Sequence, residues 1–304
     1  MEPTLRGVRA KLDRAYEHFR TLRDESPSIV RGHRVLHDTV VLPHPDAHGY
    51  NFNLPKLDPL DANRWAVVLG DLLFNLRAAL DQLVYQLHVV EYGSSTIPEA
   101  VERNSAFPIK HAAPRTKKGV LIQTTKWPQI ANLPRLQRAV IQRYQPYNTR
   151  NDGLNERRAA LALLEILNNV DKHRRLHIVR QVAVRARSPV FHKRYGFVSK
   201  PHLGAVRSGA KVDEWRFRFI SDDVRGELAE QVDRHGVELQ EVLDETGAPL
   251  PVFELTRHLQ NKVLEVVEEF VPFFEEAGIA DRELALPEII KPATWEHWVG
   301  VWPI

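Results

Sequence analysis

The amino-acid sequence predicts an α+β protein, with a core of four long helices beside a β-hairpin and a small antiparallel sheet. Three observations predict this class: apolar residues recur every three to four positions in four long segments, they alternate in two others, and turn residues separate these segments. The predicted helices cover residues 4–24, 61–91, 155–177 and 251–277, and the predicted β segments cover 34–54 and 178–245. We expect one domain over 1–304, closed by a tail at 285–304 that contains Trp295, Trp298 and Trp302.

Each predicted helix has its own apolar pattern. The helix at 4–24 has one narrow apolar seam, and the helix at 61–91 is apolar on most sides, so we expect the latter at the centre, with Asp61 or Asn63 as its N-cap. The helix at 155–177 starts with Ala and Leu and ends in basic residues, which suit the negative end of the helix dipole. Pro251 opens the last helix, which has a stripe of Val, Leu and Phe.

The segment between the two central helices is expected to be mostly loop. Residues 92–152 contain Pro98, Pro108, Pro114, Pro128, Pro134 and Pro146, with polar stretches between them. We predict one short helix in it, at 132–144. A connection of this length is usually functional or wraps the core.

Composition excludes several classes of protein. With 43% hydrophobic and 27% charged residues, the chain is neither collagen-like nor disordered. No apolar run is long enough to span a membrane and the first residues have no apolar core typical of a secretory signal, so we expect a cytoplasmic protein without membrane contact. The absence of cysteine excludes disulfides and thiolate metal sites, and we expect no metal and no cofactor.

Charge is unevenly distributed along the chain. Residues 110–200 contain 20 Lys and Arg against four acidic residues, a formal charge of +16, whereas the rest of the chain carries −13. A basic block of this size attracts polyanions, of which nucleic acids such as RNA are the commonest. The alternative is that the acidic C-terminal third packs against the basic middle and neutralises it.

The predicted central helix contains two sets of polar residues. At about 100° per residue, Asp71, Asn75, Gln82 and Gln86 lie in one narrow sector, and Arg77 and Asp81 form an i, i+4 pair on another side. Buried polar groups need partners, so each set should face a cavity, another polar surface or a second subunit. Arg77 and Asp81 therefore form either a structural salt bridge or part of a site.

The helix at 155–177 ends in a cluster of charged and polar residues. Its C-terminal part contains Asn169, Asp171, Lys172, His173 and Arg174. Neighbouring cations favour the neutral form of His173 unless a carboxylate offsets them, so this histidine is a candidate acid or base near neutral pH. The cations suit a phosphate ligand, and the alternative is that they only cap the helix.

Four short motifs resemble a family of uncharacterised bacterial proteins that is widespread in actinobacteria. They are Gly70-Asp71 with Asn75-Leu76-Arg77-x-Ala79-Leu80-Asp81, then Phe107-Pro108-Ile109, then Gln145-Pro146-Tyr147, then Asn169-x-Asp171-Lys172-His173-Arg174. The family pattern implies histidine at the positions of Phe74 and Gln82, and its central helix is similar to the Arg-x-x-x-x-His motif of HEPN domains. HEPN domains are helical dimers that cleave RNA without a metal, or bind nucleotide when the motif is degenerate.

This resemblance implies an RNA-interacting protein, a homodimer, and a role for each candidate residue. Arg77 would hold the scissile phosphate. Gln82 cannot exchange a proton at neutral pH, so His173, with Asp171, would have to reach the same cleft for catalysis. The catalytic candidates are thus Arg77, His173 and Asp171, and the substrate-binding candidates are Asn75, Asp81, Asn169, Lys172 and Arg174.

Two other functions remain open from the sequence. The first is a small-molecule enzyme or binding protein whose anion pocket lies between the two polar helices, with Lys172 and Arg174 on the anion. The second is a non-enzymatic interaction module of a bacterial defence or prophage locus, in which the polar residues are structural and the tryptophan tail binds a partner.

Overall fold

The computed structural model has an α+β fold, as the sequence predicts. It describes residues 3–26, 36–41, 47–54, 60–93, 96–148, 160–172, 177, 179–186, 198–201, 204–205, 211–217, 228, 232, 237–243 and 250–279. The chain divides into two compact units: unit 1 contains Met1–Thr21, Ala66–His177 and Phe253–Ile304, and unit 2 contains Leu22–Trp65 and Ile178–Val252. The prediction of a single domain stays a prediction, and the tail at 285–304 lies outside the described residues.

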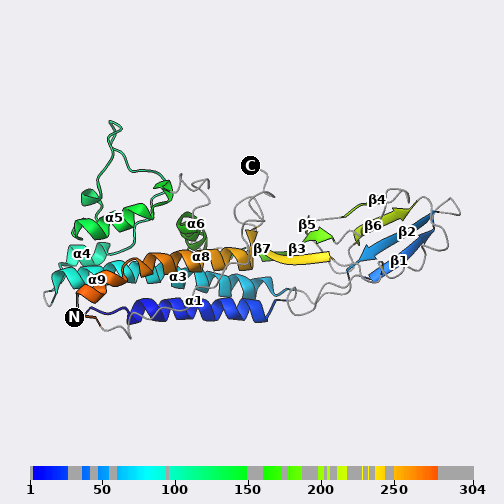
Figure 1. The fold of residues 1–304 in the computed structure, drawn as a ribbon, viewed down its shortest axis with the longest axis horizontal. Coiled ribbons are helices and arrows are strands. Elements are labelled where there is room, and N and C mark those ends of the chain that lie inside the picture. Colours follow the sequence, from blue (N-terminus) through cyan, green and yellow to red (C-terminus); the bar gives the residue numbers. More distant parts are fainter. Residues whose placement is uncertain are drawn as a thin grey trace. The chain divides into compact units, whose positions relative to one another are not determined.

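The long helices agree closely with the apolar patterns (Figure 1). They are α1 (Arg6–Asp24), α3 (Ala62–Tyr92), α6 (Ala160–Lys172) and α8 (Val252–Glu268). In α1 the whole predicted seam from Leu5 to Leu22 is buried, and Phe19 packs edge-on against Phe253 of α8 at 6.2 Å between ring centroids. In α3 the side chain of Asp61 caps the helix, because its Oδ1 accepts a hydrogen bond from Arg64 N at 3.0 Å.

The predicted last helix is two helices in the structure. Helix α8 ends at Glu268 and a short helix, α9 (Val271–Glu276), follows it. Pro272 accounts for the break, because a proline ring clashes with the carbonyl four residues earlier, which here belongs to Glu268. Phe270 at the junction is fully buried, so the break is part of the core.

Among the described residues between α3 and α6, there are three short helical segments. The predicted helix at 132–144 is confirmed as α5 (Arg135–Arg143), which starts directly after Pro134. Helix α4 (Glu99–Asn104) and the 3₁₀ turn η1 (Thr124–Lys126) were not predicted from the sequence. Among the described residues, no helix is long and apolar enough to cross a membrane.

Unit 2 contains two four-stranded antiparallel sheets. Their orders are β1-β2-β6-β4 and β5-β3-β7-β8. The strands are β1 (Leu36–Val41), β2 (His48–Asn53), β3 (Val179–Ala186), β4 (Val198–Ser199), β5 (Gly204–Ala205), β6 (Lys211–Phe217), β7 (Val237–Leu243) and β8 (Leu250–Pro251). The predicted hairpin at 34–54 is confirmed, but it is not separate from the later strands, because β6 pairs with β2 along its length.

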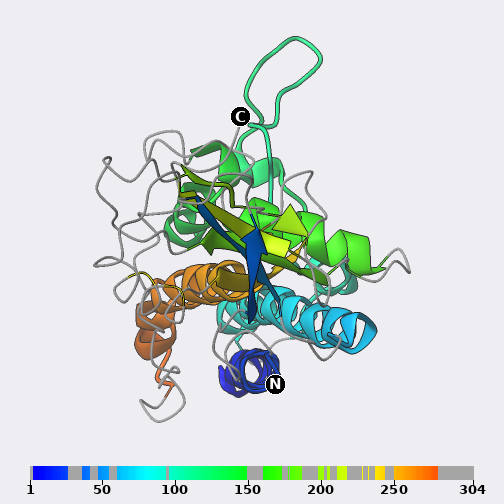
Figure 2. The same ribbon diagram turned by 90° about the vertical axis from the view of Figure 1, so that its right-hand side faces the viewer.

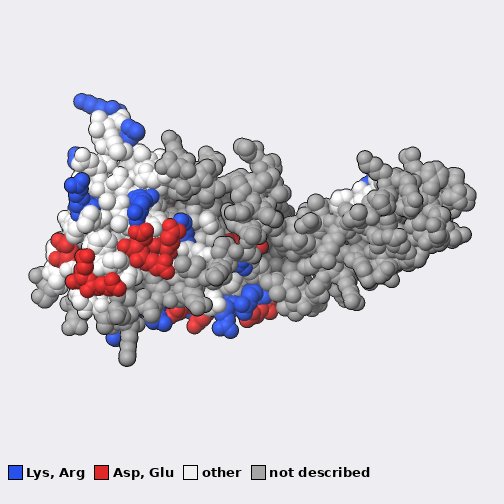
Figure 3. Space-filling model, in the orientation of Figure 1, with Lys and Arg blue, Asp and Glu red and all other residues white. Residues whose placement is uncertain are grey.

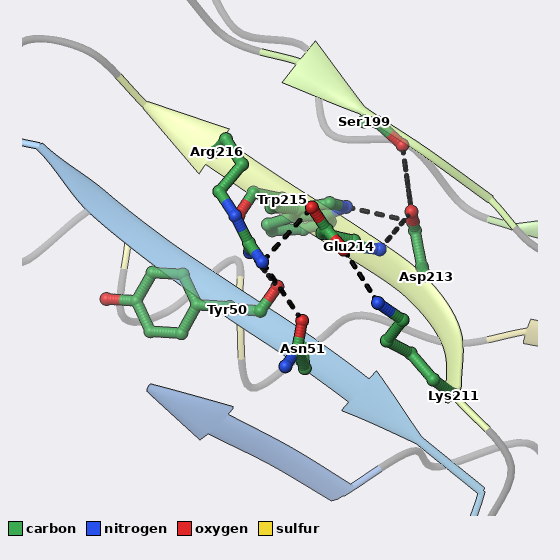
Figure 4. Close-up of polar contacts among 8 residues, drawn as sticks. All are labelled: Tyr50, Asn51, Ser199, Lys211, Asp213, Glu214, Trp215 and Arg216. Carbon is green, nitrogen blue, oxygen red and sulfur yellow. Dashed lines mark hydrogen bonds and ion pairs between the residues drawn. The ribbon is translucent and has the colours of Figure 1, made fainter. Parts of the chain in front are cut away.

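One buried carboxylate organises the end of the first sheet (Figure 4). Asp213 is fully buried beside Trp215, and its carboxylate accepts hydrogen bonds from Ser199 Oγ at 3.1 Å, Glu214 N at 2.7 Å and Trp215 Nε1 at 2.9 Å. On the other face of β6, Arg216 donates to the carbonyl of Tyr50 and pairs with Glu214 at 3.1 Å. The carboxylate joins β4 to β6 and fixes the indole against Phe52, whose ring centroid is 4.6 Å away.

We predict that Asp213→Ala lowers the free energy of unfolding by about 3 kcal/mol, because it leaves several buried donors without an acceptor. Asp213→Asn keeps one acceptor oxygen and should lose less. Urea unfolding followed by tryptophan fluorescence measures both variants, and equal stability of Asp213→Ala and the unmodified protein would contradict a structural role for this carboxylate.

Candidate nucleic-acid interface

In the described part of unit 1, an exposed basic hairpin lies between α4 and α5, and we call it the arm (residues 110–126). Its two sides are joined by hydrogen bonds from Thr116 N to Val120 O and from Ile122 N to Pro114 O, both at 2.8 Å. Gly119 forms the turn with a φ of 78°, a left-handed conformation that favours glycine. In both ribbon views the arm stands away from the helices of unit 1 (Figures 1 and 2).

The arm carries only positive charge. It contains Lys110, Arg115, Lys117, Lys118 and Lys126 and no acidic residue. Arg115 donates to the carbonyl of Gly119 at 2.7 Å, and none of the five cations forms an ion pair with an acidic residue in the described part of the chain. Figure 3 shows Lys and Arg on the projecting arm, whereas the patches of Asp and Glu lie below it on the body of unit 1. The arm is therefore a source of uncompensated positive potential.

Two aliphatic side chains are exposed next to these cations. Val120 is 62% exposed and Leu121 is 45% exposed. Lys117 and Lys118 precede them in the turn, and Arg115 lies opposite Leu121 in the hairpin. Exposed aliphatic groups beside cations are suited to a ligand with both charged and apolar surfaces.

The base of the arm is held by the Arg77 and Asp81 pair of α3. Arg77 Nη2 lies 3.0 Å from Asp81 Oδ1 and donates to the carbonyl of Phe107 at 2.7 Å, while Phe107 N donates to the same Asp81 oxygen at 3.0 Å. The side chains of Arg77 and Asp81 are 14% and 34% exposed. The pair satisfies both main-chain groups of Phe107, whose ring is fully buried, and so fixes where the chain enters the arm.

A second set of hydrogen bonds fixes the same segment from α5. The buried side chain of Gln145 donates to the carbonyl of Pro108 at 2.8 Å and accepts from Lys110 N at 2.9 Å. Its Nε2 also donates to the carbonyl of Ile141 at 2.9 Å. Residues 107–110 are thus attached to α3 and to the end of α5, and we call these contacts the clamp.

A third contact joins the arm to α6. His111 Nε2 lies 2.5 Å from Glu165 Oε2, and both side chains are partly exposed. The contact brings the fourth motif helix next to the segment that follows Phe107-Pro108-Ile109. The first three motifs, far apart in the sequence, meet at the base of the arm through Arg77 and Asp81, Phe107, and Gln145.

The acidic C-terminal part of the chain neutralises a cation of the basic segment at the end of α5, away from the arm. Arg143 of α5 forms an ion pair with Glu269, and the Tyr144 hydroxyl is hydrogen-bonded to Glu265 of α8. Burial, followed by the charges of these two carboxylates, raises the pKa of Tyr144 far above its ordinary value. The alternative from the sequence is thus correct for the end of α5, whereas the arm keeps its charge.

The first polar set of α3 faces α1. Gln86 Oε1 accepts a hydrogen bond from Thr4 N at 2.8 Å, and a Cβ on Gly7 would lie 2.6 Å from Gln82 Oε1. Asn75 is buried, and its side chain donates to the carbonyl of Asp71 in its own helix at 2.7 Å. Asn75 and Gln82 therefore take part in helix packing, and Gln82, at the position of the HEPN histidine, lies against the backbone of α1.

The remaining predicted site residues lie at the end of α6. Asn169 is exposed and its neighbour Asn168 is buried. Asp171 and Lys172 belong to the last turn of α6, but their side chains lie outside the described part, as do His173 and Arg174 entirely. The predicted approach of His173 to Arg77 stays a prediction.

Sequence reasoning missed the residues that shape the base of the arm. Gln145 and the main chain of Phe107 are not part of any periodic pattern, and their role depends on contacts with residues more than 25 positions away. The only indication was that both belong to the short motifs Phe107-Pro108-Ile109 and Gln145-Pro146-Tyr147.

Comparison with protein-family models, curated proteins and solved structures gives no significant match. Within the described residues, no group of three or more His, Cys, Asp or Glu side chains is arranged to hold a metal ion. The functional argument therefore depends on the arm and the clamp themselves.

We predict that Asp81→Ala lowers the free energy of unfolding by about 2 kcal/mol, because it leaves Phe107 N without an acceptor and the partly buried Arg77 guanidinium without its ion-pair partner. Asp81→Asn keeps the acceptor for Phe107 N and should cost about half as much. Urea denaturation compares the two variants. If Asp81→Ala unfolded at the same urea concentration as the unmodified protein, the clamp would not hold the arm.

Buried histidines should make stability depend on pH. Burial lowers the pKa of His88, whose Nε2 lies 3.0 Å from Gln129 O, and it also lowers the pKa of His18 and His258. Below about pH 6.5 the unfolded chain binds more protons than the folded chain. These histidines therefore contribute fully to the free energy of unfolding above about pH 6.5. Their contribution falls as the pH decreases toward the lowered pKa values, by up to about 1.4 kcal/mol per pH unit for each group.

We predict that His88→Gln makes the free energy of unfolding less dependent on pH between pH 7 and 5, because one of these groups no longer titrates. Chemical denaturation at several pH values measures this slope. An identical slope in the variant and the unmodified protein would mean that His88 does not remain neutral in the folded state.

Proposed function

We propose that this protein is a cytoplasmic RNA-binding protein of HEPN-like character, and that the arm of unit 1 is its phosphate-binding surface. One observation carries the proposal: five cations lie on an exposed hairpin that has no acidic residue, and none of them is in an ion pair with a described acidic residue. Clustered cations without internal partners release counterions when they meet a polyphosphate backbone, which is the main source of affinity for nucleic acids.

The clamp supports binding rather than cleavage as the function. In a HEPN-type nuclease Arg77 would hold the scissile phosphate, but here its Nη2 is engaged by Phe107 O and Asp81. Gln82 replaces the histidine and has no proton to transfer at neutral pH. We therefore propose the degenerate, RNA-binding relative, a homodimer as in the resembling domains, with Asn169, Lys172, His173 and Arg174 as an additional phosphate-binding group.

Cleavage has a direct test. Labelled RNA incubated with the protein in the presence of a chelator should stay intact. Cleavage that is lost in both Arg77→Ala and His173→Ala, in protein that remains folded by circular dichroism, would replace this proposal with a metal-independent RNase.

Salt dependence tests the binding surface. We predict that the affinity for RNA falls steeply as the salt concentration rises. In a plot of log Kd against log salt, each phosphate contact adds about 0.7 to 0.9 to the slope. The double variant Lys117→Ala, Lys118→Ala should bind at least about tenfold more weakly at low salt and lose about two from this slope. Fluorescence anisotropy with a labelled RNA measures both quantities.

The matched control is Arg14→Ala, Arg20→Ala, which removes the same charge from the exposed face of α1. This control should change the affinity and the slope little. Equal weakening by both double variants would mean that net charge, not the arm, attracts RNA, and absence of RNA binding by the unmodified protein at low salt would contradict the function itself.

A further inference from the structure

We infer that the arm recognises double-stranded RNA, with its tip in the wide, shallow minor groove; this rests on the proposed RNA-binding function and names its substrate class. Three features of the arm carry the inference: the chemistry it lacks, the two-sided shape of the hairpin, and the aliphatic pair at its tip.

The arm has no Phe, Tyr or Trp side chain on which unstacked bases could stack, and its one histidine, His111, is engaged by Glu165. Proteins that bind single strands place bases on exposed aromatic side chains. Residues 110–126 contain no Phe, Tyr or Trp, and in the adjoining described segment 96–148 Phe107 and Trp127 are 0% and 3% exposed. Tyr144 and Tyr147 are only partly exposed, and the charges of Arg143 and Lys262 lie 5.6 and 5.8 Å from the ring centre of Tyr144. This part of the chain is therefore suited to phosphates and sugars more than to bare bases.

The hairpin has cations at its tip, on one side and at its base. Lys117 and Lys118 lie at the turn, Arg115 lies on one side, and Lys110 and Lys126 lie where the two sides join unit 1. A two-sided ribbon with cations at its tip and base can contact phosphates on both borders of a groove. A single strand offers only one line of phosphates to the same ribbon.

Val120 and Leu121 favour the minor groove of the RNA duplex over its major groove. A-form RNA has a deep, narrow major groove that side chains do not enter, and a shallow minor groove that exposes sugars and 2′-hydroxyls. Val120 and Leu121, 62% and 45% exposed, have no hydrogen-bonding group and follow Lys117 and Lys118 directly after the turn. They can lie on ribose surfaces while the lysines contact phosphate. Recognition would then depend on the shape of the duplex and not on its base sequence.

The test compares three labelled probes with the full-length protein by fluorescence anisotropy. They are an RNA duplex of about 20 base pairs, longer than the roughly 16 that a double-stranded RNA-binding domain covers, a DNA duplex of the same sequence, and an oligouridine of equal length. We expect the RNA duplex to bind at least about tenfold more tightly than either other probe, because the DNA duplex lacks the wide, shallow minor groove of A-form RNA and oligouridine lacks the second line of phosphates. Oligouridine or the DNA duplex binding as tightly as the RNA duplex would overturn this inference and leave the proposed function standing; no binding to either RNA would contradict the proposed function.

The variant Val120→Ser, Leu121→Ser tests the tip without changing charge. It should weaken duplex binding by about five- to tenfold and leave the salt slope unchanged, because the number of phosphate contacts is the same. Leu136→Ser on α5 is the matched control, since Leu136 is 69% exposed and lies outside the arm. Equal affinities of the tip variant and the control for the duplex would overturn the placement of the tip in the groove.

Discussion

The position of the arm depends on one ion pair, between Arg77 and Asp81 of α3. Because the two side chains are paired and each is hydrogen-bonded to the main chain of Phe107, they fix the segment from which the arm projects. Gln145, which follows α5, holds Pro108 and Lys110, so the hairpin starts from a rigid base even though its tip has few contacts. A pair on a buried helix thus determines where an exposed, charged element lies.

Charge is separated within unit 1 in a way that favours an external anion. At the end of α5 the cation of Arg143 is balanced by Glu269, and Tyr144 is joined to Glu265, so the acidic surface of α8 serves the fold there. The five Lys and Arg side chains of the arm have no such partner among the described residues, and their charge stays uncompensated. Isolated surface cations cost little in water, so the arm is stable without a ligand and available to one.

Local patterns in the sequence predicted what local physics determines. The seam of α1, the Asp61 cap and the hairpin at 34–54 depend on neighbours close in sequence, and all three are confirmed. The spacing also allowed Arg77 and Asp81 to be paired, but not their contact with Phe107, because no periodicity relates a helix to a loop 26 residues away. The addition of β6 to the first hairpin is long-range in the same sense. The break before α9 is also local, because Pro272 is a sequence signal for the end of a helix, although the apolar stripe continues past it.

The central claim is that RNA binds at the arm, and hydrogen exchange of the full-length protein tests it most directly. The amides of Thr116, Gly119, Val120 and Ile122 take part in the hairpin hydrogen bonds and exchange through opening of the hairpin. With saturating RNA duplex, exchange in peptides covering 110–126 should slow markedly, while peptides from α1 and unit 2 should not change. If RNA slowed exchange only in other peptides, and the arm exchanged as fast as in the protein without RNA, the account would be contradicted.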